Sequence, residues 1–184
     1  MNKVILKRDN AAKEQEPCIR KVQPGDEKAL AHIQTESWKA AFADILDSET
    51  LTRCTDITKA EKMYKSLIEE NKGNGYLLTL NGKAHCIAWW DAARDEDMRG
   101  KAELICIHSL PDNWRKGYGR MMMRRVLDDI KNAGYSEVVL WVFSENSRAR
   151  AFYESEGFHA LSKMKSALGT EEICYLKEMY LFCA

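Results

Sequence analysis

Apolar residues recur along the chain in short runs bounded by turn residues, a pattern typical of β-strands. Asn81-Gly82 separates two such runs and is a strong signal for a hairpin, and a second hairpin is centred on Gly169. The pattern predicts strands over residues 18–23, 76–80, 84–90, 102–110, 138–143, 158–166 and 172–182.

Helical periodicity and helix-end signals occupy the segments between these strands. Pro24-Gly25-Asp26 starts a helix, and residues 38–46 either continue it or begin a second short one. A capping box over residues 58–61 predicts a helix that reaches about Glu70. The predicted face of the first helix consists of Leu30, Ile33, Ser37 and Trp38. The order β, helices, β, β, β, α, β, α, β, β predicts an α+β fold with mixed strand directions.

A glycine-rich junction follows the strand at residues 102–110. Gly117 and Gly119 let the main chain approach an anion closely, and the first N–H groups of the next helix add partial positive charge. Phosphate binding is the first hypothesis, and a simple turn is the alternative. A dinucleotide fingerprint does not fit, because Met122 stands where its third glycine is required, and no Gly-Lys-Ser/Thr of a Walker A motif follows. The helix has an apolar stripe of Met122, Val126, Leu127 and Ile130 and ends at Gly134.

A second segment lies about one βα unit downstream. Asn146 predicts a helix N-cap, and Gly157 predicts the end of that helix. Ala149, Phe152 and Tyr153 lie between them at helical spacings and share one face. A tyrosine in such a position either belongs to the core or presents its phenol on an ordered helix.

Together the two segments resemble the GCN5-related N-acetyltransferase (GNAT) family. The first family motif, [Q/R]-x-x-G-x-[G/A], corresponds to Trp114-Arg115-Lys116-Gly117-Tyr118-Gly119, and Trp114 departs from the usual arginine or glutamine. The second motif corresponds to Asn146, Ala149, Phe152, Tyr153, Gly157 and Phe158. The resemblance implies a three-layer GNAT fold, with a mixed, mostly antiparallel sheet of about seven strands flanked by helices.

The resemblance also implies acetyl-CoA as co-substrate and no metal. Backbone N–H groups at Ser109 and Leu110 would donate to the oxyanion that forms from the thioester carbonyl, and the glycine loop would hold the pyrophosphate. The residues implied to bind acetyl-CoA are Ser109, Leu110, Arg115, Lys116, Gly117, Tyr118, Gly119, Arg120, Asn146 and Tyr153.

Acetyl transfer to an amine requires a base, because an alkyl amine is neutral in only about one molecule in 2,500 at pH 7. Glu103 matches the glutamate that histone acetyltransferases of this family use, and it acts directly or through a water in this hypothesis. The alternative is a carboxylate without a role, and Asp91 and Asp112 are weaker candidates for the base. Tyr153 corresponds to the family's general acid, which donates a hydrogen bond or a proton to the leaving thiolate.

Two other residues of the strand at 102–110 have chemistry to offer. Cys106 could form an acetyl-cysteine, although a free cysteine in an apolar strand is usually a core residue. His108 alternates to the same face and could act as a base or stand as a hydrogen-bonded structural histidine.

The acceptor is expected to be an amine, of a small molecule or of a peptide. Trp38 and Phe42 lie in the helical region that flanks the acceptor cleft of this fold, and Trp90 and Asp91 end a strand that could form the opposite wall. Aromatic rings with a carboxylate suit a cationic amine. The same rings would also serve to fill the core, since strand alternation sends either Trp89 or Trp90 inward.

Composition narrows the alternatives. The 28 basic and 28 acidic residues give a formal net charge of zero, which argues against a general nucleic-acid binder. Neither a membrane span nor a signal peptide is expected, and the six cysteines predict free thiols in a reducing, cytoplasmic compartment. Residues 1–16 are expected to form an N-terminal extension and 17–184 a single domain.

The leading hypothesis is therefore an acetyl-CoA-dependent N-acetyltransferase. The alternative is a non-catalytic acyl-CoA-binding or sensing module on the same fold, and a transferase of longer acyl groups is a third reading. A homodimer is left open by the sequence.

Overall fold

One seven-stranded mixed sheet organises the chain in the computed structural model, which describes residues 16–179. Its strand order is β1-β2-β3-β4-β5-β7-β6, and the β4–β5 pair is parallel whereas the other neighbours are antiparallel. The strands are β1 (Pro17–Lys21), β2 (Asn74–Leu80), β3 (Lys83–Ala92), β4 (Ala102–Ser109), β5 (Glu137–Phe143), β6 (His159–Ala167) and β7 (Thr170–Glu178).

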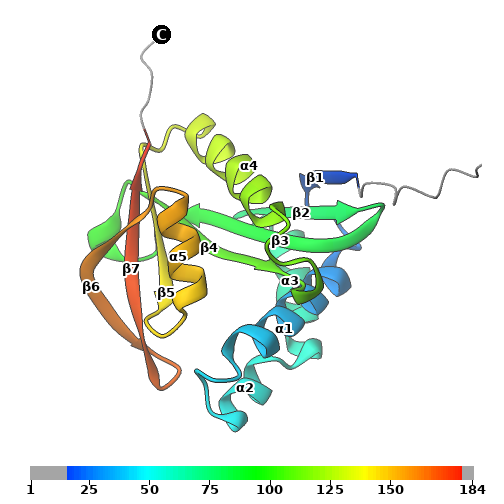
Figure 1. Cartoon of the computed structure of the whole chain (residues 1–184). Coiled ribbons are helices and arrows are strands. Elements are labelled where there is room, and N and C mark those ends of the chain that lie inside the picture. Colours follow the sequence, from blue (N-terminus) through cyan, green and yellow to red (C-terminus); the bar gives the residue numbers. More distant parts are fainter. Residues whose placement is uncertain (1–15, 180–184) are drawn as a thin grey trace, which may run out of the picture.

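Helices cover both faces of this sheet, giving three layers (Figure 1). The helices are α1 (Glu27–Phe42), α2 (Ser48–Cys54), α3 (Ile57–Glu69), α4 (Tyr118–Asn132) and α5 (Ser147–Ser155). We call the side where α1 and α3 pack on Leu77, Ile87 and Trp89 the α1 face. The opposite side, where α4 and α5 pack on the sheet through residues such as Met122 and Tyr153, is the α4 face. The predicted α+β fold class is confirmed. Within the described part of the chain, no helix has the length and apolar character needed to cross a membrane.

The parallel pair β4 and β5 separates soon after it forms. Its register contains only the pairs Ala102 with Val138 and Glu103 with Val139 within the described residues. A register shift opposite Trp89 and Trp90 leaves Ile105 as an extra residue in β4, and such bulges bend a strand. Figure 1 shows the result, since β1 to β4 and β5 to β7 run at a steep angle to each other. The later part of β4 therefore presents backbone groups toward a gap.

The structure confirms the predicted Asn81-Gly82 turn and the predicted ends of helix α5. Asn81 and Gly82 form the β2–β3 turn with φ of 50° and 77°. Asn146 caps α5 by accepting a hydrogen bond from the Ala149 N–H at 3.1 Å, and Gly157, with φ of 85°, follows that helix.

Several predicted boundaries differ from the structure by one or more residues, and three of the differences concern helix α3, the end of α1 and the last strand. Asp56, and not Thr58, is the N-cap of α3, because its carboxylate accepts from the Lys59 N–H at 3.1 Å. The stretch 38–46 does not continue as one helix, since α1 ends at Phe42 and the separate helix α2 was not predicted. The last strand begins at Thr170 and ends at Glu178, two residues earlier at its start than expected, and the predicted residues 180–182 lie outside the described part.

Gly75 packs closely against the indole ring of Trp89 on the α1 face, and a substitution at Gly75 can test this packing. A Cβ at this position would overlap the Trp89 ring and lie 2.7 Å from Val22 Cγ2. We expect Gly75→Ala to lower the free energy of unfolding by about 1–3 kcal/mol, as overpacking does. Thr79→Ala in the same strand adds no atoms and is expected to cost about 0.5 kcal/mol or less. Urea unfolding measures both, and equal losses would contradict this packing.

Candidate active site

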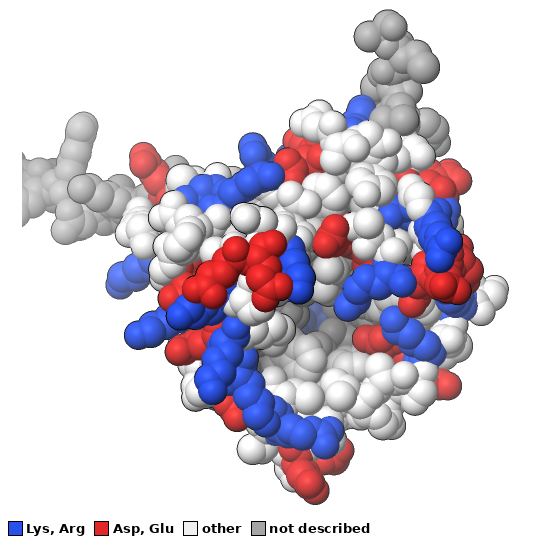
Figure 2. All heavy atoms as spheres, turned by 180° about the vertical axis from the view of Figure 1, so that it is seen from behind, with Lys and Arg blue, Asp and Glu red and all other residues white. Residues whose placement is uncertain are grey.

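A large cavity of about 1150 Å³ lies where β4 and β5 separate. Its walls come from β4 and β5, from α1 and α3 on one side, and from the start of α4 and from α5 on the other. Figure 2 shows the back of the molecule hollowed near its centre, with basic and acidic side chains around the hollow. The cavity thus reaches from the α4 face, through the gap between strands, to the α1 face.

The glycine loop forms one end of this cavity. Gly117 is the N-cap of α4 with φ of 88°, a left-handed conformation that favours glycine, and no side chain caps the helix. The first intrahelical bond runs from the Met121 N–H to the Gly117 carbonyl at 3.1 Å, so the N–H groups of Gly119 and Arg120 have no partner in the helix ladder. A Cβ on Gly119 would meet only Phe152, at 3.7 Å. The protein itself therefore leaves room at Gly119, which suits close approach of an anion.

Arg148 supplies a cation that the sequence reasoning missed. Its guanidinium carbon lies 3.4 Å from the centre of the Trp114 ring, and the Trp114 indole N–H donates to the Ser109 carbonyl at 3.0 Å. Burial lowers the pKa of Arg148, and the charge of Arg115 lowers it further. Trp114, which departs from the family motif, thus supports an arginine from another segment. The position of Arg148, two residues after the helix cap Asn146, was the sequence signal that could have identified it as a candidate.

Some of the other residues predicted to bind acetyl-CoA line the cavity, and others do not. Ser109, Arg115, Tyr118 and Asn146 line the cavity with the two glycines. Arg120 also lines it, but its Nε donates to Glu156 at 2.7 Å. Lys116 lies outside the lining and donates to Asn113 at 2.6 Å. The Leu110 amide already donates to the His85 carbonyl at 3.0 Å, which argues against its use as an oxyanion donor.

Tyr153 lines the cavity. Its ring packs against Phe152, Phe158 and Tyr175, and the residue is 8% exposed. Burial is the main reason why the pKa of Tyr153 is raised well above its ordinary value. The phenol therefore stays protonated. Its hydroxyl has no hydrogen-bond partner among residues 16–179, so it is available to a ligand.

Glu103 does not line the cavity. Its side chain is buried and accepts hydrogen bonds from Arg94, from Nε at 3.0 Å, from the guanidinium Nη2 at 2.5 Å and from the backbone N–H at 3.2 Å. Burial alone would raise the pKa of Glu103, but the hydrogen bonds and charge of Arg94 outweigh it, and the pKa is lowered. A fixed, strongly ionised carboxylate is a weak base, so this placement argues against the role expected for Glu103.

Three of the four residues predicted to bind the acceptor line the cavity. Trp38, Phe42 and Asp91 line it, and the Trp38 ring packs edge-on against Phe42 at 5.0 Å. Trp90 was misplaced. It points to the α4 face, where its indole N–H donates to Asp129 at 3.0 Å. Strand alternation sends Trp89, and not Trp90, to the α1 face.

Cys106 and His108 line the cavity as neutral groups. Burial raises the pKa of the Cys106 thiol to about 12, which argues against a thiolate nucleophile. Burial also lowers the pKa of His108 to about 4. Its Nε2 accepts from the Trp38 indole N–H at 3.4 Å, so this histidine holds the aromatic wall in place.

Comparisons with known proteins agree with this geometry. The curated relatives include the ribosomal protein bS18 alanine N-acetyltransferase of Escherichia coli K12, which is 35% identical over 103 residues covering 54% of this chain. The match spans 64% of that relative, or slightly less than two thirds. The spermidine N(1)-acetyltransferase of Thermoplasma acidophilum is 25% identical over 142 residues, covering 76% of this chain and 86% of the relative.

Solved structures share the fold. The PaiA N-acetyltransferase of Thermoplasma acidophilum, in complex with coenzyme A, superposes with a TM-score of 0.74 at 21% identity, covering 89% of this chain and 99% of that one. The Escherichia coli ribosomal-protein-S18-alanine N-acetyltransferase gives 0.66 at 23% identity, covering 90% and 96%. In addition, residues 30–158 match the sequence model described as the acetyltransferase (GNAT) family. The chain therefore belongs to the GNAT acetyltransferase family.

Proposed function

We propose that this protein is an acetyl-CoA-dependent N-acetyltransferase that acts on a primary amine by direct attack in a ternary complex. One observation carries the proposal. The cavity joins an uncapped helix N-terminus, an open strand edge and a protonated tyrosine in one continuous space. These are the three features that an anionic, amide-containing thioester donor requires.

The donor half of the cavity fits acetyl-CoA, which supplies an activated acetyl group when bound. The N–H groups at the start of α4 and the Gly117 backbone would hold the pyrophosphate. Arg115 and Arg148 lie close enough for Arg115 to lower the pKa of Arg148, and a phosphate between them would relieve that repulsion. The unpaired edge of β4, including residues 105–109, would pair with the amides of the pantetheine arm.

Tyr153 acts on the leaving group in this proposal. A thiol is a stronger acid than a phenol by about 1.5 pKa units on reference values, so complete proton transfer is not strongly driven. The raised pKa keeps a hydrogen on the Tyr153 oxygen at all physiological pH values. The hydroxyl can then donate a hydrogen bond to the thiolate as it leaves.

The acceptor half suits an amine with an apolar surround. Trp38 and Phe42 form an aromatic wall, and Asp91 adds a carboxylate at the same cavity. Of the relatives, one is named for a protein alanine and another for spermidine. Both names describe primary amines, and this shared chemistry supports a primary amine as the acceptor here.

Release of free CoA thiol from acetyl-CoA tests the proposal. The purified chain would be assayed with polyamines, aminoglycosides and short peptides with free N-termini. Release that depends on one amine class is the expected result. Tight acetyl-CoA binding without amine-dependent release from any of them would instead favour the non-catalytic binding module.

The Tyr153 hydroxyl can be tested by Tyr153→Phe. Because this change removes the donor and leaves the packed ring, we expect turnover to fall by about 10²-fold or more. The dissociation constant of acetyl-CoA, measured by calorimetry, should stay nearly unchanged. Unchanged turnover would remove Tyr153 from the mechanism.

Arg148→Ala tests the stacked cation at the phosphate end. We expect the dissociation constant of CoA to rise by about tenfold or more, since a hydrogen bond to a charged group is typically worth about 1.5–3 kcal/mol. Lys116→Ala is the matched control, because Lys116 lies outside the cavity lining and donates to Asn113. Calorimetry at two salt concentrations measures both variants, and equal affinities would contradict a role for Arg148.

A further inference from the structure

The proposed reaction leaves one requirement without a residue, namely a group that takes the proton from the acceptor ammonium. Glu103 is held by Arg94 and lies outside the cavity lining. Within residues 16–179, two carboxylates line the cavity, Asp91 and Glu172. The sequence reasoning did not consider Glu172, because it lies in a late hairpin strand outside both family motifs.

Glu172 lies beside the acceptor side of the cavity. In the sheet register it stands directly opposite Phe143 of β5 and Lys165 of β6. Directly opposed residues share one face of a sheet, and the Phe143 ring packs against Phe42 of α1 at 5.0 Å. Glu172 therefore belongs to the α1 face, on the side where the aromatic acceptor wall stands.

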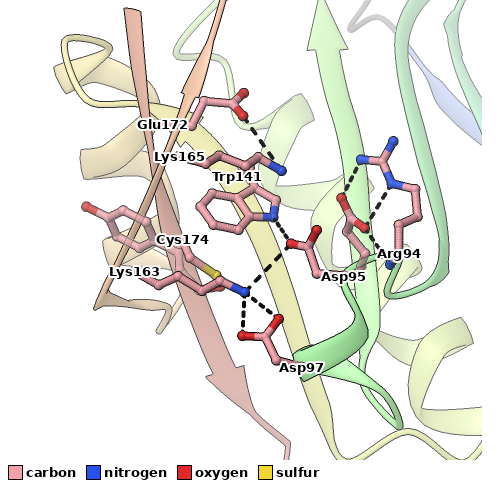
Figure 3. Close-up of polar contacts among 10 residues, drawn as sticks. Arg94, Asp95, Asp97, Trp141, Lys163, Lys165, Glu172 and Cys174 are labelled. Carbon is pink, nitrogen blue, oxygen red and sulfur yellow. Dashed lines mark hydrogen bonds and ion pairs between the residues drawn. The ribbon is translucent and has the colours of Figure 1, made fainter.

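The carboxylate of Glu172 has few polar partners within the described residues. Its nearest cation is Lys165, whose Nζ lies 3.9 Å from Oε2, and no hydrogen bond to the carboxylate occurs within the described chain. Figure 3 shows Lys165 stacked above the Trp141 ring, and the measured distance from its Nζ to the ring centre is 3.9 Å. The ammonium is thus shared between an aromatic face and the carboxylate. By contrast, Asp91 Oδ1 accepts from the Ala92 N–H at 2.7 Å.

The charges around Glu172 act in both directions. Burial has the largest effect, and it raises the pKa of Glu172 above the usual glutamate value. Lys165 of β6 and Arg94 of the segment after β3 lower the pKa, whereas Glu103 of β4 and Asp95 raise it. The net direction is upward, and a carboxylate with a raised pKa is a better proton acceptor than one in water.

We propose that Glu172 is the general base for acetyl transfer, an inference that rests on the proposed function. One N–H bond of the acceptor ammonium breaks, the proton moves to a carboxylate oxygen of Glu172, and nitrogen keeps the electron pair for attack on the thioester carbonyl. The proton taken is the one released overall when an ammonium and a thioester become an amide and a thiol. Arg94 holds the neighbouring Glu103 ionised, and the negative charge of Glu103 favours protonation of Glu172.

The pH dependence of kcat/KM tests this assignment. The assay uses CoA release with the amine that the wild-type protein accepts, and it compares wild type, Glu172→Gln, Glu172→Asp and Glu103→Gln. A base with a raised pKa gives an acid limb, in which kcat/KM falls as the pH drops through that pKa. We expect Glu172→Gln to lower kcat/KM by about 10²-fold or more at neutral pH and to abolish the acid limb set by this base, so that only the ionisation of the amine itself still changes kcat/KM with pH. Glu172→Asp should keep the limb with reduced activity.

Glu103→Gln is the matched control, since it neutralises the adjacent carboxylate without removing the proposed base. It should keep an acid limb, shifted to lower pH because a negative neighbour of Glu172 is lost. Circular dichroism and acetyl-CoA binding by calorimetry check that each variant is folded and binds the donor.

The outcomes separate this inference from the proposed function. Absence of amine-dependent turnover in wild type would overturn both. Wild-type turnover with an intact acid limb in Glu172→Gln would overturn the role of Glu172 alone, as would loss of the limb in Glu103→Gln and not in Glu172→Gln. Loss of the limb only in Glu172→Gln, with recovery in Glu172→Asp, establishes the base.

Discussion

The early separation of β4 from β5 is the constraint on which the rest of the site depends. Two register pairs join these parallel strands, and the extra residue Ile105 then turns β4 away. The N–H and C=O groups of a strand edge need hydrogen-bond partners, and along the cavity either water or a ligand can supply them. The cavity, the helix N-terminus of α4 and the tyrosine of α5 all converge on that edge. A ligand with its own amides meets this requirement in the way that an additional strand would.

Burial assigns opposite roles to groups that look alike in the sequence. Glu103 and Glu172 are both largely buried carboxylates, yet the hydrogen bonds of Arg94 keep the first ionised, whereas the second has a raised pKa and an ion pair with Lys165 but no hydrogen bond within the described residues. Burial also keeps Cys106 and Tyr153 protonated. Among the described residues the cavity therefore holds a protonated phenol and a carboxylate, while the Cys106 thiol is not ionised, and this favours the proposed direct attack by the amine over a covalent cysteine intermediate.

The sequence predicted features that depend on a few neighbouring residues. The Asn81-Gly82 turn, the Asn146 cap and the Gly117 loop each follow from local backbone chemistry. Asp56 was missed because two capping candidates stand two residues apart, and only the fold decides between them. The partners of side chains distant in sequence could not be derived in this way. The stacking of Arg148 on Trp114, the hydrogen bonds of Arg94 to Glu103 and the packing of Trp90 into the core of the α4 face all depend on how separate elements pack.

Amide hydrogen exchange with and without acetyl-CoA is the most direct test of the central claim, that the open edge of β4 and the start of α4 hold the donor. The account predicts slower exchange when acetyl-CoA is bound for the N–H groups of residues 105–109 that face away from β3 and for those of Gly119 and Arg120, because these groups gain partners there. Exchange in β1 and β6, which lie at the two edges of the sheet, should be unchanged. Slowing confined to α1 to α3, with none in β4, would contradict the claim.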